Sequence, residues 1–283
     1  MTNNTLTIRP ARAADRDAVF AMIAMIWDGS DYIPQVWDSW LGADSGPLLV
    51  GTLDGRVVAL SKLTALSASE DWLEGVRVDP DYRGRGLART MIRHCVDVSR
   101  ERGMGMLRYS TSARNLTMQR LGVELGFTLA YAPDWYGATA IVGTPHTRAL
   151  PPASLPALLD RLEGSRLLAL TGGLYTYNWS SVELTEERLR ERLAAGQVVG
   201  LPGGSAWAIR VPSRWGGAWI AHAEGRSDEL ARLFTALRHT DAPFEDEAFI
   251  RSHVPAGAPQ LPALHEAGYT PGDHAACIFE YRL

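Results

Sequence analysis

A seven-residue motif occurs twice in this 283-residue chain, and its spacing constrains the fold more than any other feature. The first copy starts at Arg83 and reads RGRGLAR, and the second starts at Arg226 and reads RSDELAR. The surrounding segments correspond at nearly constant spacing, because Arg226 follows Arg83 by 143 residues and Tyr269 follows Phe127 by 142. An internal repeat of this length predicts two modules of the same kind.

A linker can be placed between the two modules. The segment 144–156 reads TPHTRALPPASLP, with four prolines and no hydrophobic periodicity, which is typical of a connection. A chain of this length is long enough for two domains. We therefore expect one domain at residues 1–145 and a diverged copy of it at 146–283.

The first module reads as strands and helices. The dipeptide Asp54-Gly55 predicts a tight hairpin, the segment 72–80 predicts a further strand, and apolar residues at helical spacing predict a helix over 87–102. The segments FTLAYAP and YGATAIVG predict a closing pair of strands. The expected fold class is α/β (α+β), with a mixed, mostly antiparallel sheet flanked by helices in a tandem duplication.

Composition limits the partners and the location. The formal net charge is -4, so no basic field recruits nucleic acid. The longest apolar run, 18–27, is too short to span a bilayer, and the N-terminal segment lacks the apolar core of a signal peptide. Two cysteines, Cys95 and Cys277, cannot form a disulfide framework. We expect a cytoplasmic protein with no membrane or nucleic-acid partner, either a monomer or a homodimer.

The first copy of the motif predicts an anion site. A strand ends, a loop with Gly84 and Gly86 follows, and a helix starts at once. The free amides of the first helical turn and the helix dipole favour an anion there, and glycines allow close approach of a phosphate. The arginines Arg83, Arg85 and Arg89 add positive charge. The Walker A pattern is absent, and a Rossmann fingerprint would need a glycine where Arg89 stands.

The motif and its context resemble the GCN5-related N-acetyltransferase (GNAT) superfamily. Arg83-x-x-Gly86-x-Ala88 has the Q/R-x-x-G-x-G/A acetyl-CoA pattern, VRVDPDYRGRG surrounds it, and ARN and ELGF follow. The similarity covers most of residues 5–143. It implies acetyl-CoA as cosubstrate, with the pyrophosphate on loop amides and the pantetheine along the preceding strand. The implied contacts are Val76, Arg77, Val78, Arg83, Gly84, Arg85, Gly86, Leu87, Ala88, Arg89 and Asn115.

The second copy of the motif predicts a loop that repels such a ligand. Asp228 and Glu229 stand where the first copy has Arg85 and Gly86. They place negative charge against a phosphate and side chains where close backbone approach was needed. We therefore expect one working acetyl-CoA site, in the first module.

The resemblance also implies a catalytic base. Glu74 lies on the predicted strand where the superfamily often places a general base, and the amide of Val76 or Arg77 is an expected oxyanion donor. A carboxylate in a half-buried cleft can have a raised pKa that suits this role. The alternative for Glu74 is a side chain that faces solvent or pairs with an arginine.

The proton donor to the leaving thiolate is an open point. The superfamily often has a tyrosine four residues before the glycine of its GF pair, and here that position is Gly122. Tyr131 and Tyr136 are the catalytic candidates for the role, with water as the alternative. Loss of the tyrosine is compatible with catalysis, because a CoA thiolate is a tolerable leaving group.

An aromatic and acidic segment predicts the acceptor site. Residues 27–41 read WDGSDYIPQVWDSWL. Asp31, Tyr32 and Trp37 can form an acidic and aromatic wall for a cationic amine, whereas the alternative is a helix packed on the core. With the EGVRV strand, this segment resembles the histidine N-acetyltransferase-like branch, which implies a free amino acid or similar small amine as acceptor.

The sequence thus predicts an acetyl-CoA-dependent N-acetyltransferase that acts on a small primary amine by direct attack in a ternary complex. One alternative is acetylation of a protein terminus. A second, from another class, is a non-catalytic acyl-CoA-responsive regulator, which Gly122 favours. The seven histidines show no pair at metal-ligand spacing, so no metal is expected.

Overall fold

The computed structural model describes residues 5–241 and 249–283, which form two compact units that share both halves of the chain. Unit 1 consists of Met1–Tyr109, Thr117–Thr128 and Phe279–Leu283, and unit 2 consists of Ser110–Leu116 and Leu129–Ile278. The compact units therefore do not divide at the predicted boundary between residues 145 and 146.

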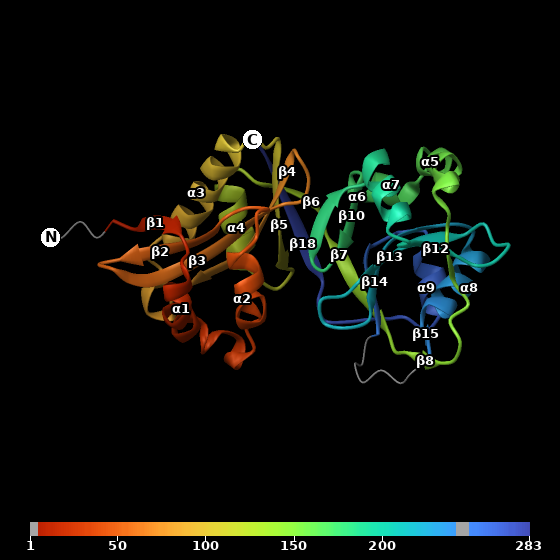
Figure 1. Cartoon of the computed structure of the whole chain (residues 1–283), viewed down its shortest axis with the longest axis horizontal. Helices are drawn as coiled ribbons and strands as arrows, with labels where there is room; N and C mark the ends of the chain where they lie inside the picture. Colours follow the sequence, from red (N-terminus) through yellow and green to blue (C-terminus); the bar gives the residue numbers. More distant parts are fainter. Residues whose placement is uncertain (1–4, 242–248) are drawn as a thin grey trace. The chain divides into compact units, whose positions relative to one another are not determined.

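A seven-stranded mixed sheet, whose strands β1 to β4 lie wholly in unit 1, has the order β1-β2-β3-β4-β5-β18-β6 (Figure 1). Strands β1 to β4 pair antiparallel, and β4 pairs parallel with β5. The strands are β1 (Thr7–Pro10), β2 (Leu48–Leu53), β3 (Arg56–Ala65), β4 (Glu70–Val78), β5 (Met106–Ser112), β6 (Thr128–Tyr131) and β18 (Ala276–Arg282), and the helices are α1 (Arg16–Ile23), α2 (Ile33–Leu41), α3 (Leu87–Glu101) and α4 (Leu116–Glu124).

Local sequence explains these elements. Asp54 and Gly55 have φ of 48° and 81°, as a two-residue hairpin turn with the twist of its strands requires. Helices α1 and α2 bury Val19 and Trp37 against the sheet residue Leu60. Because successive strand residues face opposite ways, the neighbouring Ser61 faces α3, where its hydroxyl contacts the Cys95 thiol.

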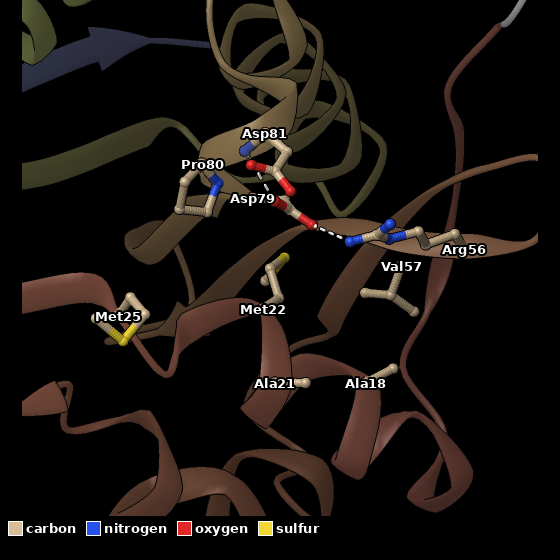
Figure 2. A pocket seen from close by; sticks show the side chains of 9 residues that line it. All are labelled: Ala18, Ala21, Met22, Met25, Arg56, Val57, Asp79, Pro80 and Asp81. Carbon is tan, nitrogen blue, oxygen red and sulfur yellow. Dashed lines mark hydrogen bonds and ion pairs between the residues drawn. The ribbon is translucent and has the colours of Figure 1, made fainter.

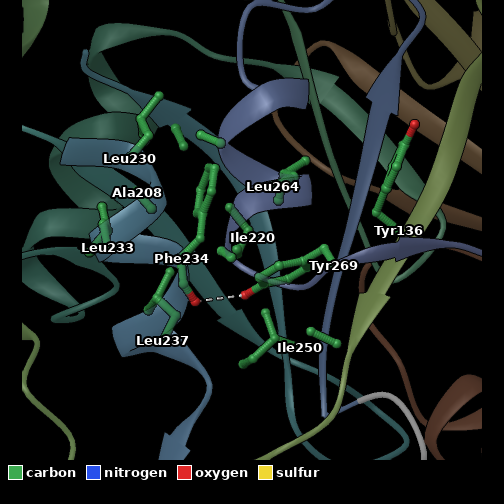
Figure 3. Close-up of a cluster of buried hydrophobic side chains, with 14 of the residues drawn as sticks. Tyr136, Ala208, Ile220, Leu230, Leu233, Phe234, Leu237, Ile250, Leu264 and Tyr269 are labelled. Carbon is green, nitrogen blue, oxygen red and sulfur yellow. Dashed lines mark hydrogen bonds between the residues drawn. The ribbon is translucent and has the colours of Figure 1, made fainter. Parts of the chain in front are cut away.

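Unit 2 has a second seven-stranded mixed sheet, in the order β17-β7-β16-β14-β13-β12-β9. Helices α8 and α9 cover one face, where Tyr269 donates to the carbonyl oxygen of Phe234 at 3.1 Å within the apolar core (Figure 3). The strands are β7 (Pro133–Ala138), β8 (Ile141–Val142), β9 (Arg148–Ala149), β10 (Leu174–Tyr177), β11 (Ser180–Glu183), β12 (Val198–Gly200), β13 (Trp207–Pro212), β14 (Ala218–Glu224), β15 (His239–Thr240), β16 (Ile250–Pro255) and β17 (Thr270–Pro271), and the helices are α5 (Leu155–Leu162), α6 (Arg166–Thr171), α7 (Glu186–Ala194), α8 (Ser227–Leu237) and α9 (Leu261–Glu266).

The two sheets have the same plan, and each takes one strand from the other half of the chain. In both, a run of antiparallel strands meets one parallel pair, β4 with β5 and β14 with β16. The next place is filled by the C-terminal strand β18 in the first sheet and by β7 in the second. The predicted closing pair of strands is therefore wrong, because β6 and β7 lie in different sheets. The predicted mixed, mostly antiparallel sheets flanked by helices are confirmed.

Candidate functional site

Strand β4 carries a bulge that shapes the candidate site. Lys62 of β3 pairs with Glu74, and Leu60 pairs with Arg77, so one extra residue is inserted between the two pairs. Since Leu60 and Lys62 share a face, the bulge puts the side chains of Glu74 and Arg77 on that face too. Gly75 allows it with φ of 66°, and a Cβ there would meet the Trp40 ring at 2.8 Å. This face is the one that α1 and α2 cover.

Beyond the bulge, β4 runs on after its pairing with β5 has ended. The parallel register extends from Glu70 with Met106 to Trp72 with Arg108, and β4 continues to Val78. Backbone groups along that stretch can therefore bond a ligand lying beside the strand. The half-buried residues Val76, Arg77 and Val78 belong to this stretch, as the resemblance implies for the pantetheine arm.

The glycine loop leads from β4 to the N-terminus of α3. Gly84 and Gly86 have φ of 74° and 77°, and a Cβ on either would meet nothing within 4 Å. Glycine is thus required by the left-handed backbone rather than by crowding. Gly86 is the N-cap of α3, which starts with Leu87 and Ala88. The first amides of this helix open onto an exposed loop, a geometry that binds phosphate.

The three loop arginines have different surroundings. Arg83 is exposed. Arg85 lies 4.8 Å from the centre of the Tyr82 ring and donates to the carbonyl oxygen of Asp81. Arg89 forms an ion pair with Glu124 of α4. Arg83 and Arg85 are therefore exposed cations beside the loop amides, whereas Arg89 also ties α3 to α4.

The predicted catalytic tyrosines and Asn115 fall outside unit 1. Asn115 is exposed and precedes α4, in the segment Ser110–Leu116 of unit 2. The Tyr131 hydroxyl is buried against the hydroxyls of Thr176 and Ser181. Tyr136 is part of the apolar core of unit 2, where burial raises the pKa of its hydroxyl. The contacts of Tyr131 and Tyr136 within unit 2 therefore indicate a structural role for both side chains.

At position 122 of α4, where the resemblance implies a tyrosine, the space beside the backbone is filled by a side chain from β5. A Cβ on Gly122 would lie 1.9 Å from the hydroxyl oxygen of Tyr109, which comes from β5. The Tyr109 ring stacks on Phe279 at 5.2 Å and meets Phe127 edge-on at 5.1 Å, so it is held in place. Glycine at position 122 is therefore a packing requirement imposed by Tyr109.

Gly122→Ala is expected to lower the free energy of unfolding by about 1–3 kcal/mol, because it overpacks this contact. Urea unfolding measures the change. Tyr109→Phe in the same background should recover part of the loss, since it removes the atom that clashes. Val123→Ala, at a position 62% exposed on the same helix, is the control and should stay within about 0.5 kcal/mol. Equal effects at 122 and 123 would contradict the packing account.

Glu74 is half-buried and hydrogen-bonded. Thr64 of β3 donates to its carboxylate at 3.3 Å. Lys62, its partner in register, is 1% exposed and donates its Nζ to the carbonyl oxygen of Gly46. Burial lowers the pKa of Lys62 to about 8, while the charge of Glu74 acts in the opposite direction. The predicted base therefore sits beside a buried cation that the sequence reasoning missed.

All three predicted acceptor residues have contacts within the fold. The Asp31 carboxylate accepts from Nε of Arg77 at 2.7 Å and from the amide of Ile33, so it is paired rather than open to an incoming amine. Trp37 is 1% exposed and packs in the core. Tyr32 lies under the Arg77 guanidinium at 5.5 Å. Asp31 and Tyr32 thus hold Arg77 at the face that carries Glu74.

The second copy of the motif has no comparable loop. Only Gly225 and Arg226 separate β14 from α8, where Asp79–Gly86 separate β4 from α3. Asp228 pairs with Arg226, and Glu229 accepts from Ser205. The Gln260 side chain, 3% exposed, donates to the carbonyl oxygen of Ala223 at the end of β14. Chain length and packing therefore disfavour a phosphate there, in addition to charge.

A hollow of about 380 Å³ lies between α1 with the turn after it and the start of the glycine loop. Figure 2 shows its charged side, where Arg56 pairs with Asp79 at 3.0 Å. Asp79 also accepts from the amide of Asp81. Two carboxylates at this rim disfavour a phosphate, so the hollow is separate from the anion site. Its lining is Ala18, Ala21, Met22, Met25, Arg56, Val57, Asp79, Pro80 and Asp81.

Among residues 5–241 and 249–283, no group of three or more histidine, cysteine or acidic side chains is placed to hold a metal ion. Within the same residues, no helix combines the length and apolar character needed to cross a membrane.

In this chain a bulged strand outruns its parallel neighbour and is followed by a glycine loop at a helix N-terminus, an arrangement that agrees with the resemblance to GNAT folds. Residues 17–127 match the acetyltransferase (GNAT) family model. The solved GCN5-related N-acetyltransferase from Sphaerobacter thermophilus aligns with a TM-score of 0.64 at 15% identity, over 98% of this chain and 95% of that one. The similarity to the GNAT family model thus covers residues 17–127, and the fold likeness extends over both units.

Named relatives match shorter stretches. The histidine N-acetyltransferase of Oreochromis niloticus is 33% identical over 93 residues, which are 32% of this chain and 28% of that protein. The ribosomal protein bS18-alanine N-acetyltransferase of Escherichia coli K12 is 33% identical over 79 residues, 28% of this chain and 53% of that protein. The matched stretch thus spans just over a quarter of the first relative and about half of the second.

Proposed function

We propose that this chain is an N-acetyltransferase that uses acetyl-CoA to acetylate the primary amine of a small, amino-acid-like molecule. The glycine loop at the N-terminus of α3, continuous with the bulged strand that bears Glu74, is the observation that carries the proposal. Its amides suit the pyrophosphate of acetyl-CoA, and β4 offers backbone groups to the pantetheine arm. Histidine N-acetyltransferases among the relatives support a small amine as acceptor.

The residues suggest direct attack in a ternary complex. Glu74 takes a proton from the substrate ammonium, and the neutral nitrogen attacks the thioester carbonyl carbon. The amide of Val76 or Arg77 donates to the oxyanion that forms. The carbon–sulfur bond then breaks, and the second proton of the nitrogen ends on the thiolate sulfur. Water is the proposed carrier of that last proton, because the Tyr131 hydroxyl is engaged by Thr176 and Ser181 and Tyr136 belongs to the apolar core of unit 2.

Unit 2 contributes no second acetyl-CoA site under this proposal. Its two-residue connection between β14 and α8, the acids of the first turn of α8 and the Gln260 side chain support that assignment. The identical strand plan of the two sheets supports a duplicated origin with one copy degenerate. A cytoplasmic location and the lack of nucleic-acid and membrane partners stay predictions from composition.

Release of free CoA thiol on mixing with acetyl-CoA and amines tests the proposal. A panel of amino acids, histidine included, polyamines, aminoglycosides and a peptide with N-terminal alanine is compared at fixed pH. Thiol release that depends on a small amine supports the proposal. Turnover of the peptide alone would favour the protein-terminus alternative, which the bS18-alanine relative motivates. Acetyl-CoA binding without turnover of any amine would favour the non-catalytic regulator.

A further inference from the structure

Lys62 is an unusual residue in this protein. Lysine and arginine number 28 together, and Lys62 is the single lysine among them. It is also 1% exposed, in the middle of β3. Lysine is almost never fully buried unless it is paired, and only lysine, not arginine, loses its proton in a protein environment. Lys62 is therefore the one lysine or arginine side chain of this sequence that can readily lose its proton, and it is buried.

The position of Lys62 couples it to Glu74. The two residues are direct partners in the antiparallel register of β3 and β4, and directly opposed side chains on one face lie close together. The Glu74 charge raises the pKa of Lys62 against the effect of burial. An interaction between two charges is reciprocal, so the ammonium favours the ionised form of the Glu74 carboxyl to the same extent.

Other charged groups of β4 and α3 near Lys62 and Glu74 form ion pairs or hydrogen bonds with other residues. On β4, Arg77 is paired with Asp31, and Asp71 accepts from Ser99 and pairs with Arg102 at the end of α3. The charges of Asp71 and Arg102 act on Lys62 in opposite directions.

Neutral groups also contact Lys62 and Glu74. From the segment before β2, the carbonyl oxygen of Gly46 accepts from the Lys62 ammonium. From β3, the Thr64 hydroxyl donates to Glu74. Glu74 thus accepts a hydrogen bond from one residue of β3 and is paired in register with another, Lys62.

We propose that Lys62 is a positioning residue for Glu74, whose buried ammonium keeps that carboxyl ionised and ready to accept the proton of the acceptor amine. This inference rests on the proposed acetyltransferase function. It gives the base its charge at a pH where a carboxyl in an apolar cleft would otherwise hold its proton. The acceptor ammonium can then lose its proton to Glu74 at neutral pH or below.

A direct titration tests the coupling without any substrate. Because the chain has one lysine, protein labelled with [ε-13C]lysine gives a single Cε resonance whose shift reports the Lys62 proton. We expect a pKa near 8 in the wild type and a pKa lower by about one unit in Glu74→Gln, since an opposite charge is removed. Glu101→Gln, at an exposed site on α3, is the control and should leave the resonance unchanged. Equal Lys62 titration in the wild type and Glu74→Gln would overturn the proposal.

The pH dependence of turnover tests the consequence for catalysis. Lys62→Met keeps the length of the side chain and removes its charge. The ratio of wild-type to Lys62→Met kcat/KM should be largest, about tenfold, at low pH, and should approach one as the pH rises. Protonation of the substrate amine affects both proteins equally and cancels in the ratio. Lys62→Arg, which keeps the charge, should restore the low-pH activity.

Structural damage and failure of the proposed function give different results. A merely structural Lys62 would lower activity by the same factor at every pH, with a lower midpoint of thermal unfolding. In a Glu74→Gln background, Lys62→Met should no longer change the shape of the pH profile. If the wild type turns over no amine, the proposed function fails, yet the lysine titration still decides whether Lys62 and Glu74 are coupled. A pH-independent ratio in an active enzyme would overturn the positioning role alone.

Discussion

Gly86→Glu is expected to abolish acetyl-CoA binding, with a loss of at least about hundredfold in affinity measured by calorimetry. The substitution puts a carboxylate at the N-cap of α3, beside the amides that would hold the pyrophosphate. Like charges in contact at a binding site cost several kcal/mol, and about 2.7 kcal/mol corresponds to hundredfold. The φ of 77° at Gly86 adds backbone strain, although a Cβ would meet no atom within 4 Å.

Matched variants separate charge, strain and location. Gly103→Glu carries the same charge at a glycine with φ of 74° and equally open surroundings, in the turn after α3, and should bind acetyl-CoA as the wild type does. Gly86→Ala keeps the strain without the charge and should lose much less affinity than Gly86→Glu. Asp228→Gly, in the second copy, should change nothing. Comparable losses from Gly86→Glu and Asp228→Gly would contradict a single site in the N-terminal domain.

Local features of the fold could be predicted, because short-range rules govern them. The hairpin at Asp54-Gly55 follows from two residues with positive φ, and α3 follows from apolar spacing. The exchange of β7 and β18 between the two sheets could not be predicted. Strand pattern alone does not say which sheet receives a strand when two similar sheets compete.

The geometry of the glycine loop was predictable, and the groups around Glu74 were not. A strand, two glycines and a helix N-terminus are adjacent in sequence, so their chemistry could be inferred directly. The bulge at Gly75 changes which side chains share a face, and that depends on register with β3. Asp31 was interpreted as a receptor for a cation, but the bulge brings Arg77 to it first. A usable signal for Lys62 did exist, since the sequence contains one lysine.

Glu74→Gln is expected to lower kcat/KM by about 10²–10⁴-fold at neutral pH, the range for loss of a positioned general base. Glutamine keeps the size of the side chain and can still accept from Thr64, so the fold and acetyl-CoA affinity should change little. The pH profile provides the decisive measurement. Without the carboxylate, the acceptor must already be neutral when it binds, so the variant should regain activity as the pH approaches the pKa of the free amine. The wild type should reach its plateau at lower pH.

A comparison of acceptors that differ in the pKa of their amine can distinguish proton removal by Glu74 from its other roles. An acceptor whose amine is already neutral at pH 7 needs no base for that first proton, so Glu74→Gln should turn it over with a much smaller loss than an ordinary aliphatic amine shows. Glu101→Gln should match the wild type with both acceptors. A uniform loss across acceptors and pH would mean that Glu74 orients the substrate instead. An unchanged kcat/KM would remove Glu74 from the mechanism, and with it the reason for a buried lysine opposite.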